Sequence, residues 1–160
     1  MQKLSINTRS FDRILSKLLN SESGIKKVIL VDRTGLTIAR ISNFSYFPAD
    51  VDGIAAIAGA VFSATEEQGE SLELGGLEIV TSEFSVGKIF TSGCGSSAVI
   101  AIISDPDINI GLIRLILKRS TDELKKILEG FFRDDNDDDT LYYRDPRDPA
   151  GGSEGALADF

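Results

Sequence analysis

The sequence predicts an α/β (α+β) fold whose elements follow the order α-β-β-α-β-β-β-α, with a five-stranded antiparallel sheet. Three observations predict it: two β-rich runs joined by a short turn, a helix-length run without charged side chains, and a later meander of three short strands. Helices and sheets bury their apolar faces against one another. We therefore expect the middle helix on one face of the sheet and the N- and C-terminal helices on the other.

The first helix is predicted to begin near Ser10, a good N-cap residue, and to end before Gly24. Between these points, apolar residues recur at helical spacing and form one face. Two β-rich runs follow, at residues 28–31 and 36–41. Because Gly35 can adopt the positive φ that tight turns require, we expect these runs to form a hairpin.

The middle helix is the most informative segment, because residues 53–65 contain no charged side chain. A helix that packs one face on a core normally carries a charged opposite face. Asp50 is the expected N-cap, and one apolar side can cover the sheet. The other side needs a second cover, and the same helix of another copy can supply it, since small residues let helices approach closely and two-fold dimers are the commonest oligomers. The alternative is a helix enclosed within a monomeric core.

Three further strands are predicted at residues 77–81, 88–91 and 98–103. The last of these is apolar on both faces, which is typical of a strand covered by two layers. Asn109 is a plausible N-cap for the last helix, whose apolar residues recur at spacings of three and four up to Phe131.

The composition changes after residue 132. We therefore assign residues 1–132 to one domain and residues 133–160 to an acidic tail. The tail contains three arginines and nine acidic residues, and it accounts for most of the net charge of −8. Such a composition buries little apolar surface and predicts disorder, with a short docking peptide for a partner as the alternative.

The composition favours a protein that is not an enzyme. The chain has no histidine, and its single cysteine, Cys94, has no histidine to activate it. The glycine-rich residues 93–98 precede a strand rather than a helix, and residues 134–145 lack the glycine and glutamate of a calcium loop. We predict no catalytic residue, no metal site and no cofactor. The acidic balance argues against nucleic acid as a partner, and we expect a soluble, cytoplasmic protein that does not insert into a membrane.

Several segments, in their order and spacing, resemble the Roadblock family of dynein-light-chain-type proteins. They are Gly-Ile-Lys-Lys-Val-Ile-Leu-Val-Asp-Arg-Thr-Gly-Leu at 24–36, the Ala-rich helix that starts at Asp50, Gly93-x-Gly95 before an apolar strand, and Asp105-Pro106 followed by residues 109–114. The resemblance covers residues 8–130.

The resemblance implies a non-enzymatic homodimer, or a heterodimer with a paralogue, that binds a small Ras-like GTPase as a regulator or scaffold. In prokaryotic relatives the dimer acts as a GTPase-activating partner that orders the switch residues of the GTPase. Carried onto this chain, the resemblance places the dimer contacts at Ile57, Ala60, Val61, Ala64, Leu77, Ile79 and Thr81. The candidates for meeting the GTPase are Asp52, Ala56, Ser63, Glu66 and Glu67.

Two alternative functions remain open. One is a motor or cargo adaptor light chain, which would join polypeptides whatever nucleotide the partner holds. The other is a small-molecule sensory module, because a sheet with helices on both faces also serves ligand-binding proteins. An apolar pocket between the sheet and a helix, retained after dimerisation, would favour the sensor.

Overall fold

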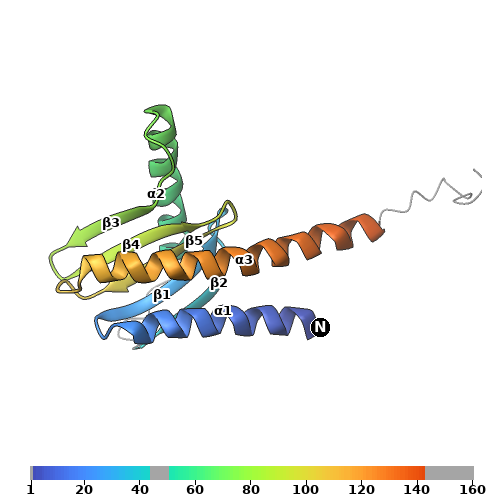
Figure 1. Cartoon of the computed structure of the whole chain (residues 1–160), viewed down its shortest axis with the longest axis horizontal. Coiled ribbons are helices and arrows are strands. Elements are labelled where there is room, and N and C mark those ends of the chain that lie inside the picture. The colour runs from blue at the N-terminus through green and yellow to red at the C-terminus, as the bar shows by residue number, and fades with distance from the viewer. Residues whose placement is uncertain (1, 44–50, 143–160) are drawn as a thin grey trace, which may run out of the picture. The chain divides into compact units, whose positions relative to one another are not determined.

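The computed structural model describes residues 2–43 and 51–142. Along them the elements are α1 (Gln2–Ser21), β1 (Ile25–Asp32), β2 (Thr37–Ser42), α2 (Val51–Ser71), β3 (Ile79–Phe84), β4 (Gly87–Cys94), β5 (Ala98–Ser104) and α3 (Ile110–Tyr142). This is the predicted order. Figure 1 shows α1 and α3 in front of the sheet and α2 behind it, which is the predicted arrangement of layers.

The five strands form one antiparallel sheet in the spatial order β2-β1-β5-β4-β3. In the register, Ile29 of β1 faces Arg40 of β2 on one side and Ala101 of β5 on the other. The doubly apolar strand β5 lies at the centre of the sheet, as its sequence predicts, and nearly all of its side chains are buried. The outer edges of the sheet belong to β2 and β3.

The core lies on both sides of the sheet because side chains alternate along each strand. On one side, Ile29 and Val31 of β1 pack with Phe62 of α2. Val28 and Leu30, which alternate with them along β1, are also fully buried. By this alternation they face the other side of the sheet.

The turn between β1 and β2 and the start of α3 form as the sequence predicts. Gly35 has a φ of +93°, a backbone conformation that favours glycine. The Asp32 carboxylate accepts hydrogen bonds from the backbone N–H groups of Thr34 (2.9 Å) and Leu36 (3.0 Å), which close the turn. At α3, the Asn109 side chain accepts a hydrogen bond of 3.0 Å from the Leu112 N–H and caps the helix.

Several boundaries differ from the predictions. Strand β1 begins at Ile25 instead of residue 28, and β4 ends at Cys94 instead of residue 91. Helix α1 begins at Gln2 instead of Ser10, because no glycine or proline interrupts the preceding residues. The strand expected at residues 77–81 is Ile79–Phe84. Helix α3 continues past Phe131 to Tyr142, again over a stretch without glycine or proline.

The chain divides into two compact units, residues 1–129 and residues 130–160. In the second unit, the helical conformation of α3 extends to Tyr142. The remainder of the predicted tail and the expected N-cap Asp50 lie outside the described residues.

Candidate protein-interaction surface

Helix α2 leaves one apolar side without a cover in a single subunit. Its inward side chains Ala55, Ala58 and Phe62 are buried. On another side, Ile57 is 65% exposed and Val61 is 41% exposed. Ala60 and Ala64 are exposed beside them. We call Ile57, Ala60, Val61 and Ala64 the outer face of α2. Large exposed apolar side chains that gather on one helix face are typical of an interaction site.

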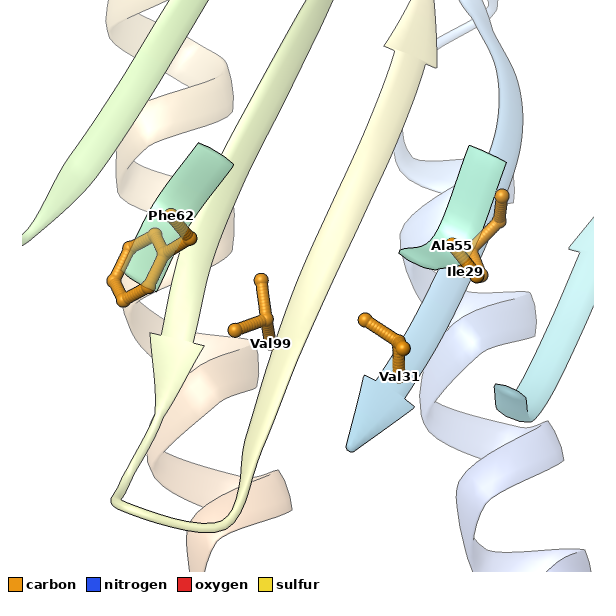
Figure 2. Close-up of a cluster of buried hydrophobic side chains, with 5 residues drawn as sticks. All are labelled: Ile29, Val31, Ala55, Phe62 and Val99. Carbon is orange, nitrogen blue, oxygen red and sulfur yellow. The ribbon is translucent and has the colours of Figure 1, made fainter. Parts of the chain in front are cut away.

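The opposite side of α2 is tightly packed and fixes the direction of the outer face. Figure 2 shows Phe62 and Ala55 of α2 with Val99 of β5 and with Ile29 and Val31 of β1. Gly93 of β4 makes room for this packing, since a Cβ atom there would lie 3.1 Å from the Phe62 ring. Helix α2 therefore cannot rotate to bury its outer face without vacating the core.

Strand β3 supplies an unpaired edge. It is the last strand of the sheet and pairs only with β4 among the described strands. Of the predicted edge contacts, Ile79 begins the strand and is half-buried, and Thr81 is exposed. Leu77 lies before the strand and packs against the cluster around Phe62. An open strand edge can pair with another chain.

The GTPase-binding candidates lie along a second flank of α2, which borders the turn between β1 and β2. Asp52 accepts a hydrogen bond of 3.1 Å from the Thr37 hydroxyl, and the backbone of Ala56 lies against Gly35. Ser63 is half-buried, and Glu67 is exposed. We call Asp52, Ala56, Ser63, Glu66 and Glu67 the turn-side flank.

Glu66 differs from the other candidates because its carboxylate forms an ion pair within the subunit. It accepts a hydrogen bond of 2.8 Å from Nη1 of Arg33, in an ion pair that is partly shielded from solvent. Nη2 of Arg33 donates to the Gly95 carbonyl oxygen at 3.0 Å, and the guanidinium lies 5.2 Å from the centroid of the Phe62 ring. Arg33 thus joins the end of β1, helix α2 and the turn between β4 and β5.

The pKa values of Asp32 and Cys94 are shifted in opposite directions. Partial burial raises the pKa of Asp32, but hydrogen bonds from the Thr34 hydroxyl and from the turn backbone outweigh it and hold the pKa below 3.8. Burial raises the pKa of the Cys94 thiol to about 12, although the positive charge of Arg33 acts in the opposite direction. Cys94 is therefore a protonated, buried thiol at neutral pH.

Two kinds of feature are absent from the described part of the chain. Within residues 2–43 and 51–142, no three histidine, cysteine or acidic side chains gather so that they could hold a metal ion. Across the same ranges, none of the helices combines the length and the apolar character needed to cross a membrane.

Sequence reasoning missed two features of this surface. The contacts of Arg33 join three segments that are far apart in the chain, so no local sequence pattern predicts them. The exposed side chains Leu36, Leu72 and Leu74 were also missed. The sequence does contain a signal that Leu72 and Leu74 are exposed. Both follow the glutamates near the end of α2, in a stretch where the sequence predicts no apolar residue to pack against them.

Comparison with known proteins agrees with this architecture. The Roadblock/LC7 domain matches residues 11–104, more than half of the chain. Two proteins of Methanocaldococcus jannaschii, the uncharacterized proteins MJ0714 and MJ0310, are each 34% identical to this chain over 116 residues. These residues make up 71% of this chain, 92% of MJ0714 and 96% of MJ0310.

Solved structures share the fold at lower sequence identity. The gliding protein MglB of Thermus thermophilus has a TM-score of 0.70 and 18% identity, over 78% of this chain and 92% of that one. A Roadblock/LC7 domain of Streptomyces avermitilis has a TM-score of 0.67 and 18% identity, over 74% of this chain and 97% of that one. The MglB of Myxococcus xanthus has a TM-score of 0.64 and 23% identity, over 78% and 95% of the two chains. By the matched domain and by its relatives, this chain belongs to the Roadblock/LC7 family.

Proposed function

We propose that this protein is a non-enzymatic, cytoplasmic platform that dimerises through α2 and β3 and binds a small Ras-like GTPase. The observation that carries the proposal is the outer face of α2, which stays exposed although the opposite face of the helix is fully packed. Covering this face with the same face of a second copy removes apolar surface from water on both subunits. The open edge of β3 allows the two sheets to join beside the paired helices.

The turn-side flank of α2 is the proposed GTPase contact. It lies next to the outer face on the same helix, so pairing of the outer faces would bring two such flanks onto one surface. Because Arg33 holds the Glu66 carboxylate, we assign Glu66 to positioning α2 as well as to the flank. Asp52, Ala56 and Glu67 remain on the surface for a partner.

A regulator of this kind needs a shaped surface rather than a catalytic group. A GTPase supplies its own phosphate-binding residues, and a partner that orders its switch segments can position the attacking water. The sensory alternative has less support. Phe62 and Ala55 pack directly against β1 and β5 beneath α2. A cavity between α3 and the start of β3 has Glu78, Arg114 and Lys118 in its lining beside its apolar residues.

The test is a pull-down against the small GTPases of the source organism, each loaded with GTP or with GDP, using the wild type and two charge variants. Glu67→Lys changes the turn-side flank. The matched control, Asp12→Lys, makes the same charge change at an exposed site on α1. We expect nucleotide-dependent capture that Glu67→Lys weakens and Asp12→Lys preserves.

Other results would favour another function. Capture that is independent of the nucleotide would favour the adaptor, and no capture of any GTPase would contradict the proposal. Single-turnover GTP hydrolysis, measured with and without the protein, then separates a GTPase-activating partner from a scaffold.

A further inference from the structure

A second surface lies beside α3, away from the outer face of α2. Between α3 and the start of β3 the structure has a cavity with a volume of about 430 Å³. Leu77, Ile79 and Leu115 contribute apolar surface to its lining, and Leu115 is half exposed. We call this cavity the α3 groove.

The charged residues of the α3 groove are mainly cationic. Arg114 and Lys118 line it, with Glu78 as its acidic member. Positions four residues apart on a helix lie on one face, about 5–6 Å from each other. Both side chains are exposed, and neither forms a hydrogen bond or an ion pair with the described part of the chain. Two free cations therefore flank one apolar depression.

The cationic side of α3 extends beyond the groove. Lys125, seven residues after Lys118, lies on the same flank of the helix, where its methylene groups pack beside Gly95. Lys125 lines a neighbouring cavity of about 350 Å³ together with Ser96 and Ser97, and Glu129 is the acidic member of this lining. We call Arg114, Lys118 and Lys125 the basic stripe, a line of three cations in a chain whose net charge is −8.

We infer that the α3 groove and the basic stripe form a docking site for an acidic segment of a partner protein, in which apolar side chains alternate with carboxylates. The charge complementarity selects this occupant: carboxylates can pair with Arg114 and Lys118 while an aliphatic side chain enters the depression between them. The linear spacing of the cations suits a polypeptide segment. The inference goes beyond the proposed GTPase platform, although the α3 groove shares Leu77 and Ile79 with the proposed dimer contact at β3.

The experiment uses the full chain and a fluorescein-labelled peptide in which leucines are interspersed with glutamates. A second peptide replaces every glutamate with glutamine. Fluorescence anisotropy measures both affinities at low and at high salt. We expect the glutamate peptide to bind more tightly than the glutamine peptide, and we expect added salt to weaken its binding.

Two double variants test the location. Arg114→Glu with Lys118→Glu is expected to weaken binding of the glutamate peptide by about tenfold or more, because attraction becomes repulsion at both positions. Arg119→Glu with Lys126→Glu makes the same charge change at exposed positions on another flank of α3 and is expected to preserve the affinity to within about twofold. Leu115→Ala is expected to weaken binding without any change of charge.

Three results would overturn the inference. The first is that the glutamate peptide does not bind the wild type. The second is that the two double variants lose peptide affinity equally. The third is that the Arg114→Glu/Lys118→Glu variant assembles into a different number of subunits than the wild type. The last result would make the α3 groove a contact between copies of this chain. Circular dichroism confirms that each variant is folded before it is compared. None of these readouts depends on GTPase binding, so the two proposals fail separately.

Discussion

Replacing Ile57 by glutamate tests whether a second copy covers the outer face of α2. Full burial of an isoleucine side chain stabilises by about 1.5–3 kcal/mol relative to exposure. Because Ile57 is 65% exposed in the single subunit, complete coverage gains about 1–2 kcal/mol per subunit and about 2–4 kcal/mol per two-fold dimer. Losing this gain weakens dimerisation by about 30-fold to about 700-fold. The desolvation of two unpaired carboxylates adds to the effect.

The assay is sedimentation of the Ile57→Glu variant and the wild type across a concentration series. Val86→Glu is the matched control, because Val86 is 85% exposed at the tip between β3 and β4 and receives the same charge. We expect Ile57→Glu to sediment as a folded monomer while Val86→Glu behaves as the wild type. A dimeric Ile57→Glu variant, or equal dissociation of both variants, would refute the reasoning.

Three further predictions concern the turns around Arg33. Gly35→Ala is expected to lower the free energy of unfolding by about 1–3 kcal/mol. Gly75→Ala is expected to lower it less, because both glycines have positive φ but only Gly35 lies against Ala56. Equal losses of unfolding free energy in urea denaturation would contradict this. The buried Cys94 thiol, with a pKa raised to about 12, is expected to react with a thiol reagent only on unfolding, and rapid labelling of the folded protein at mildly alkaline pH would disprove it. For Asp32, whose folded pKa lies below its ordinary value of 3.8, the ionised carboxylate stabilises the fold above that pH and loses this contribution as the pH falls through the folded pKa. The stability difference between the wild type and Asp32→Asn should therefore shrink in acid, and a constant difference in pH-dependent unfolding would oppose this account.

The fold follows from local patterns that the sequence shows directly. The hairpin is predictable because Gly35 marks its turn, and the central place of β5 is predictable because both of its faces are apolar. The boundaries of α1 and α3 are harder to predict. Ser10 is a good N-cap, but a cap residue does not stop a helix that has no breaker before it, and α1 begins at Gln2.

The candidate surface is only partly predictable. The lack of charge in residues 53–65 predicts an exposed apolar face, and the structure exposes Ile57 and Val61 as that pattern implies. Whether a second copy covers them is still a prediction. The pairing of Arg33 with Glu66 depends on the position of α2 on the sheet. The spacing of residues along the sequence does not predict this position.

The most direct test of the central claim is the sedimentation mass of the wild-type protein over a wide range of concentrations. We expect the mass of two subunits, with dissociation into single subunits only on dilution. A single-subunit mass at the highest concentrations would mean that the outer face of α2 stays exposed to water, and the proposed platform would be wrong.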